Sequence, residues 1–134
     1  METVVIDTNC LLAILPSKSP YHNVWQGLVE GRIALCVSNE ILMEYEEILS
    51  SRIPQAVVVN VIQTILNLPN LLQVHPTYFF ELIKEDIDDN KFVDCAICGE
   101  VELIVANDAH FNVLKTIDFP KVIIKDLKSF AELL

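Results

Sequence analysis

The segment Val4-Val5-Ile6-Asp7 is a short, β-branched apolar run that ends in a carboxylate. A second segment of the same kind, Leu103-Ile104-Val105-Ala106-Asn107-Asp108, stands near the other end of the chain. Runs of this length and composition, bounded by polar residues, are typical of buried strands. Ligand sites in a parallel α/β sheet form at the carboxyl ends of the strands. We therefore expect Asp7 and Asp108 to meet at one edge of a sheet.

Strand and helix patterns alternate along the whole chain. Strand patterns cover 3–7, 33–37, 71–75, 103–106 and 121–124, and helix patterns cover 9–15, 21–30, 39–49, 54–66, 90–98, 109–115 and 126–134. The segment 77–84 is ambiguous and is a candidate for a turn of helix. The alternation predicts an α/β fold with a mostly parallel sheet, helices on both faces and strand 103–106 beside strand 3–7, in one domain covering 1–134.

Composition excludes several classes of protein. The 134 residues are 52% hydrophobic and include three glycines, which is typical of a folded chain. No apolar run reaches the roughly 18 residues that a membrane span requires. No basic residue precedes the first apolar stretch, as one would in a signal peptide. We expect a cytoplasmic protein without a membrane partner.

The net charge of −10, from 19 acidic and 9 basic residues, is unfavourable for binding nucleic acid through Lys and Arg. Two explanations would reconcile it with such a substrate. Divalent cations can neutralise a carboxylate cluster. Alternatively, a basic partner protein can bind the acidic surface.

Two of the four cysteines, Cys95 and Cys98, form a C-x-x-C pair. The pattern can indicate zinc or redox chemistry. Its surroundings are apolar, and no second pair or neighbouring histidine completes a zinc set. We interpret both thiols as residues of a buried helix.

The phase of Glu44 on its predicted helix is informative. It follows Ile41 by three residues and precedes Ile48 by four, so it lies on or beside the buried stripe, whereas Glu46 points about 200° away. An inward-facing acid is costly unless it is paired or bound to metal. A position at the rim, with the carboxylate reaching water, is the alternative. Glu40 and Glu47 share its side of the helix.

Two other acidic positions also admit a structural role. Asp7 can cap the helix that follows it. Within the run Glu85-Asp86-Ile87-Asp88-Asp89, spacing alone does not select a ligand, and one acid is expected to cap the next helix. We favour Asp89 as the ligand, with Asp86 and Asp88 as alternatives.

The set Asp7, Glu44, Asp89 and Asp108 predicts metal-assisted phosphoryl chemistry. Carboxylate oxygens are hard ligands that suit Mg²⁺ or Mn²⁺, and such a centre activates water and neutralises charge on a phosphodiester. No Ser/His/Asp nucleophile set or glycine-rich phosphate loop competes with it. His110 is not expected to act as a ligand or base, because an isolated histidine at such a position usually does neither.

The ordered motifs of this chain resemble those of PIN domains, and in particular the VapC-type toxins of toxin–antitoxin systems. The resemblance rests on four stretches: 5–9, 38–44, 86–92 and 104–111. It implies a three-layer α/β/α sandwich and a Mg²⁺- or Mn²⁺-dependent endoribonuclease. By position, the four acids named above would be the catalytic metal ligands.

The resemblance also implies partners, which are an RNA substrate, an antitoxin that inserts into the site and a second copy in a homodimer. One position departs from the pattern: many members have Thr two residues before the last Asp, and this chain has Ala106. A PIN-like domain that binds protein or RNA without cleaving it is therefore the main alternative.

Two other α/β families fit less well. Aspartyl-phosphate hydrolases require a second acid in D-x-D, where this chain has Asp7-Thr8-Asn9. In a phosphoacceptor receiver domain, Lys125 would supply the required lysine, but Glu44 would have no role.

Overall fold

A computed structural model describes residues 2–84, 87–117 and 121–134 of the chain. Its centre is a five-stranded parallel sheet with the order β3-β2-β1-β4-β5. The strands are β1 (Glu2–Ile6), β2 (Ile33–Val37), β3 (Leu71–Gln73), β4 (Leu103–Val105) and β5 (Ile123–Lys125). The predicted parallel sheet, with strand 103–106 beside strand 3–7, is thus confirmed.

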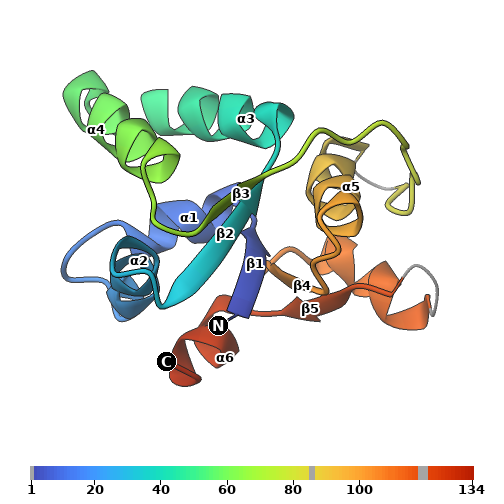
Figure 1. Ribbon diagram of the computed structural model, residues 1–134. Coiled ribbons are helices and arrows are strands. Elements are labelled where there is room, and N and C mark those ends of the chain that lie inside the picture. The colour runs from blue at the N-terminus through green and yellow to red at the C-terminus, as the bar shows by residue number, and fades with distance from the viewer. Residues whose placement is uncertain (1, 85–86, 118–120) are drawn as a thin grey trace.

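Helices cover both faces of this sheet and complete a three-layer α/β/α fold (Figure 1). They are α1 (Thr8–Ile14), α2 (His22–Val29), α3 (Asn39–Ser50), α4 (Gln55–Leu66), α5 (Asn90–Cys98) and α6 (Leu127–Glu132), with 3₁₀ helices η1 (Ile87–Asp89) and η2 (Ala109–Thr116). Helix α5 lies on the opposite side of the sheet from α1 and α2 (Figure 1). Helix α6 joins the α2 side, where Asn23 Nδ2 donates to the carbonyl of Ala131 at 3.0 Å.

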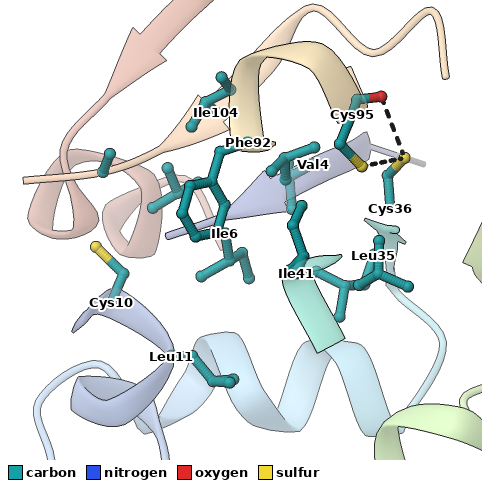
Figure 2. Packing of buried hydrophobic residues seen from close by; sticks show 14 of the residues in the cluster. Val4, Ile6, Cys10, Leu11, Leu35, Cys36, Ile41, Phe92, Cys95 and Ile104 are labelled. Atoms are coloured by element: carbon teal, nitrogen blue, oxygen red, sulfur yellow. Dashed lines mark hydrogen bonds between the residues drawn. The ribbon is translucent and has the colours of Figure 1, made fainter. Parts of the chain in front are cut away.

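Strand β1 is the axis of the core. Val4, Val5 and Ile6 are fully buried, because helices cover both faces to which their side chains alternate. Phe92 of α5 and Leu11 of α1 pack around this strand (Figure 2). A continuous apolar run, instead of an alternating one, therefore forms this central parallel strand.

Tyr45 fixes helix α3 against the end of β1. Its ring is fully buried, and its hydroxyl donates to the carbonyl of Ile6 at 2.5 Å. Ser38 caps α3 by accepting the amide of Ile41 at 3.3 Å. The helix is thereby held with Glu44, the neighbour of Tyr45, close to the residue that follows β1.

Several predicted elements differ in detail from the observed ones. Residues 74–84 form neither helix nor strand, so the turn of helix considered for 77–84 is absent, and the strand predicted to reach residue 75 ends at Gln73. The helix predicted at 109–115 is a 3₁₀ helix, and the last strand begins two residues later than predicted. Local pattern does not distinguish an α from a 3₁₀ helix when both bury the same side chains, here Phe111 and Leu114.

The C-x-x-C pair divides between core and surface. Cys95 is buried, and its Sγ lies 3.7 Å from Sγ of Cys36 on β2 (Figure 2). Cys98 is exposed, so the prediction of a buried thiol is wrong there. Three residues correspond to about 300° of helix, which carries Cys98 past the edge of the buried face.

Across the described ranges, no helix combines the length and apolar character needed to cross a membrane.

Candidate metal site

Asp7 lies at the point where β1 passes into α1. The amide of Asp7 donates to the carbonyl of Val105 at 3.0 Å, which ties it to β4. Its Oδ1 accepts the amide of Thr8 at 2.9 Å, so Asp7 also caps α1. The capping role considered from the sequence is therefore present, and it leaves further lone pairs of the carboxylate available.

The carboxylate of Asp7 is only 5% exposed, and its pKa is raised to about 7. The largest cause is burial, which disfavours the charged form. Repulsion by Asp89, Glu44 and Asp108 raises the pKa further, whereas the amide of Thr8 lowers it. Because each of these three acids influences the pKa of Asp7, the four predicted acids lie near one another, and we refer to them together as the acidic cluster.

Asp108 joins the acidic cluster from the loop after β4. Its Oδ1 accepts the amide of His110 at 2.9 Å, so it caps η2. Asp89 approaches from the end of η1, directly before α5. Oxygen atoms of these two carboxylates and a ring nitrogen of His110 lie within 4.8 Å of one another.

His110 lies beside two of the predicted acids, although its role as a ligand or base stays untested. Its Nδ1 lies 3.3 Å from Oδ1 of Asp108 and 3.6 Å from Oδ2 of Asp89. Asp108 accepts the amide of His110, and the side chain of His110 stands next to the acidic cluster. The D-x-H spacing was the only sequence signal, and it is weak without the distance to Asp89.

Glu44 belongs to the acidic cluster from helix α3 and is held by two neighbours. Its Oε2 accepts a hydrogen bond from the hydroxyl of Thr8, and its Oε1 accepts one from Nζ of Lys91 at 2.8 Å. The rim position considered for Glu44 agrees with its 20% side-chain exposure. Burial lowers the pKa of Lys91, but the hydrogen bond and charge of Glu44 outweigh it, and the net shift is upward.

The remaining acids have other surroundings. Asp94 is buried and accepts the amide of Phe80 at 3.1 Å. Burial is the main cause that raises its pKa. Asp89 occupies the N-cap position of α5 without a side-chain capping bond, so the predicted cap is not formed by this acid. Asp86 lies outside the described residues. Glu46 is exposed as predicted, and so are Glu40 and Glu47.

Asn90 attaches the segment before the acidic run to α5. Its Oδ1 accepts the amide of Ile83 at 2.8 Å, and its Nδ2 donates to the carbonyl of Ile83 at 2.7 Å. Both bonds are buried. The amide side chain of Asn90 thereby fixes the residues next to Asp89.

We expect Asn90→Leu to release this segment, because the variant leaves two buried backbone groups of Ile83 unpaired, at about 1–3 kcal/mol each. Hydrogen exchange of a peptide covering 77–84 should accelerate, while β1 keeps its protection. Asn60→Leu, on the exposed face of α4, is the matched control and should leave this peptide unchanged. Equal exchange in the two variants would contradict the role given to Asn90.

The donor set fits a hard divalent cation. Asp89, Asp108 and His110 can converge on one ion, with Asp7 beside them. Mn²⁺ accepts carboxylate oxygens together with one imidazole as ligands. Mg²⁺ prefers oxygen ligands and would bind to the carboxylates. The pKa of Asp7 is raised mainly by burial and further by repulsion from the neighbouring acids, and a bound cation would oppose both effects.

The fold and the acidic cluster define a three-layer parallel α/β protein with acidic side chains gathered near the carboxyl ends of its central strands. The family model described as PIN domain matches residues 3–110, and the chain therefore belongs to the PIN domain family. No curated protein matches the sequence.

Among solved structures, the chain is similar to one from the crystal structure of VapBC2 from Rickettsia felis bound to a DNA fragment from their promoter. The TM-score is 0.63 at 18% sequence identity, over 92% of this chain and 98% of that one. At this identity the likeness shows a shared fold over nearly the full length of both chains.

Proposed function

We propose that this protein is a divalent-metal-dependent endoribonuclease and the toxin of a toxin–antitoxin pair. PIN domains are generally nucleases, and the family match covers residues 3–110. The observation that carries the proposal is the convergence of Asp89, Asp108 and His110 within 4.8 Å, beside a buried Asp7. Such a concentration of negative charge stabilises neither the fold nor an anionic substrate by itself.

Asp7, Glu44, Asp89 and Asp108 form the catalytic centre in this proposal. A Mg²⁺ or Mn²⁺ ion bound there supplies the activation of water and the neutralisation of charge developing on a phosphodiester. The protein holds the ligands in place, because Asp7 and Asp108 are each fixed as helix caps, at 2.9 Å from an amide. Fixed ligands reduce the reorganisation needed during reaction.

Ala106 has no hydroxyl where the resemblance led us to expect a threonine, and this affects the proposal only through the placement of Asp108. Ala106 is buried, and its amide donates to the carbonyl of Lys125 at 3.1 Å. The backbone that leads to Asp108 is therefore fixed without a threonine side chain. If the protein proves inactive, the binding-only PIN domain becomes the better explanation.

Cleavage of a mixed-sequence RNA tests the proposal. Purified wild type is assayed with Mn²⁺, with Mg²⁺ and with EDTA, on single-stranded RNA and on DNA of the same sequence. We expect cleavage of RNA with either metal and none with EDTA. Asp108→Asn keeps the shape and the capping oxygen but removes the charge, and should lower the rate at least about 100-fold.

Glu46→Gln is the matched control, because Glu46 is an exposed acid on the helix that carries Glu44. It should cleave like wild type. Cleavage that survives Asp108→Asn would place the activity elsewhere or in a contaminant. Folded wild type that cleaves no RNA with any metal would favour the binding-only alternative.

The partner proposal follows from charge and from the structural neighbour. A solved structure of this fold contains VapBC2, and the net charge of this chain is −10. We therefore propose a basic antitoxin segment that covers the acidic cluster, and a homodimer of the toxin. Co-expression with the product of a neighbouring gene, followed by light scattering, would test both.

A further inference from the structure

A cavity of about 860 Å³ lies between the segment 80–84 and the 3₁₀ helix η2. Residues 80–84 form one of its walls, and side chains of η2 together with Ile117 form the other. A volume of this size is typical of pockets that bind small organic ligands. None of the roles discussed so far accounts for this cavity.

The cavity adjoins the acidic cluster through His110. The side chain of His110 lines the cavity, and its Nδ1 lies 3.3 Å from Oδ1 of Asp108 and 3.6 Å from Oδ2 of Asp89. A group bound in the cavity therefore lies beside the carboxylates that we propose as ligands of the divalent ion.

Both walls are attached to elements that begin at the acidic cluster. Helix α5 begins directly after Asp89. Its Asp94 accepts the amide of Phe80 at 3.1 Å. Its Asn90 accepts the amide of Ile83 at 2.8 Å. The other wall, η2, begins directly after the last acid of the cluster, so the fold sets the position of the cavity relative to the cluster.

Flat and apolar side chains form most of the lining. The ring of Phe80 comes from one wall and the imidazole of His110 from the other. Val113 and Ile117 add aliphatic surface. Aromatic rings of this kind bind the face of an unpaired nucleobase by stacking, with little dependence on its identity.

The polar groups of the lining suit an uncharged ligand with donors and acceptors at its edge. Glu81 and Lys84 contribute one negative and one positive charge. Asn112 adds an amide, which donates and accepts hydrogen bonds at once. An anionic phosphate gains little net attraction from this set, whereas the edge of a nucleobase offers matching donors and acceptors.

We propose that this cavity binds a nucleobase of the RNA substrate, on a nucleotide whose phosphate lies at the divalent ion of the acidic cluster. A single sugar joins a base to its phosphate, so one nucleotide can occupy both places. The inference rests on the proposed function for its substrate. It assigns to the cavity the selection of the nucleotide next to the cleaved bond.

Neutral nucleosides test the cavity apart from cleavage. Adenosine, guanosine, cytidine and uridine are each titrated, in EDTA, into wild type whose methyl groups are followed by NMR. At least one nucleoside should shift the methyl signals of Val113 and Ile117 until they saturate. The methyl signals of Val59, an exposed residue of α4, should not move. No saturable shift at Val113 and Ile117 from any of the four nucleosides would overturn the proposal.

Val113→Trp fills the cavity from a position that is 42% exposed, so the ring enters without opening the core. It should weaken nucleoside binding about 10-fold, within the range that loss of base stacking produces. Val59→Trp, at a position that is 45% exposed, is the matched control and should bind like wild type.

Phe80→Leu is a second variant with a smaller effect on packing. It keeps an apolar side chain and the backbone amide that Asp94 accepts, but it removes the aromatic ring. It should weaken nucleoside binding about 5-fold. Wild-type affinity in both Val113→Trp and Phe80→Leu would place the nucleoside elsewhere and overturn the assignment.

The ends of cleaved RNA extend the test to the substrate. Wild type with Mn²⁺ should prefer particular bases at one fixed position beside the cut. Val113→Trp should lose this preference and raise KM about 10-fold, whereas Val59→Trp should keep both values. A preference that survives Val113→Trp would show that the base is not bound here, and would favour an apolar side chain of a partner protein as the occupant.

Failure of this inference is distinguishable from failure of the proposed function. Cleavage of RNA without nucleoside binding and without base preference would reject the base site and leave the nuclease intact. Nucleoside binding by folded protein that cleaves no RNA with any metal would keep the base site and reject the nuclease.

Discussion

Asp7→Asn is expected to make the metal-free protein more stable and nearly inactive. Asp7 is 5% exposed and its pKa is raised from 3.8 to about 7. The amide keeps an oxygen for the amide of Thr8 and removes a charge that burial and three neighbouring acids disfavour. A shift of this size corresponds to a few kcal/mol, so we expect a gain of about 2–4 kcal/mol at pH 8.

The dependence of the free energy of unfolding on pH tests independently whether the charge of Asp7 destabilises the fold. Between the unfolded pKa near 4 and the folded pKa of about 7, folded wild type binds more protons at Asp7 than the unfolded chain. Its free energy of unfolding therefore falls as pH rises through this window, and the full penalty remains above it. The advantage of Asp7→Asn should vanish below about pH 4.

Urea unfolding in EDTA at pH 4, 6 and 8 measures this difference. Added Mn²⁺ should stabilise wild type and have a smaller effect on the variant, because ligand binding to the folded state alone adds stability. The cleavage rate should fall at least about 100-fold. A variant less stable than wild type at pH 8 in EDTA would show that the charge of Asp7 does not destabilise the fold.

Phe111→Ala is expected to lower the free energy of unfolding more than the other substitutions named here. Phe111 is fully buried in η2, and its ring meets Phe92 of α5 edge to face, with centroids 6.3 Å apart. Truncation of a buried phenylalanine costs about 3–5 kcal/mol through lost contacts and the cavity that remains. A domain of ordinary stability has about 5–15 kcal/mol in total, so this variant should be marginal.

Phe79→Ala provides the matched control, since Phe79 is 60% exposed and loses the same atoms. It should change the free energy of unfolding by at most about 0.5 kcal/mol. The midpoint of urea unfolding, at a constant slope, compares the two variants. A cost below about 1 kcal/mol for Phe111→Ala would mean that η2 is not anchored by this ring.

Much of the scaffold could be predicted because its signals are local. The apolar runs at 4–6 and 103–105 mark buried strands, and Ser38 and Asp126 cap the helices that follow them. Strand β1 is the sheet centre, as the pattern indicates. The fine structure of η2 and the start of β5 could not be predicted, because tertiary packing sets them.

The site could be predicted only where an acid follows a strand or holds a definite phase on a helix. Asp7, Asp108 and Glu44 meet that condition, and their catalytic roles remain proposals. The pairing of Lys91 with Glu44 spans 47 positions, and the approach of His110 to Asp89 depends on a turn at Asp108. No pattern within one segment contains these distances.

The pairing of β1 with β4 has a consequence for synthesis of the protein. Val4 lies opposite Leu103 in this pair, although β2, β3, helices α1 to α5 and the 3₁₀ helix η1 are made between them. In a nascent chain that has not yet emerged from the ribosome as far as Asp108, Asp7 lacks its partners from β4 and from the loop after it. The acidic cluster is therefore incomplete for as long as most of the message is still being translated. The RNA cleavage that we propose for this protein would begin only after β4 has paired with β1.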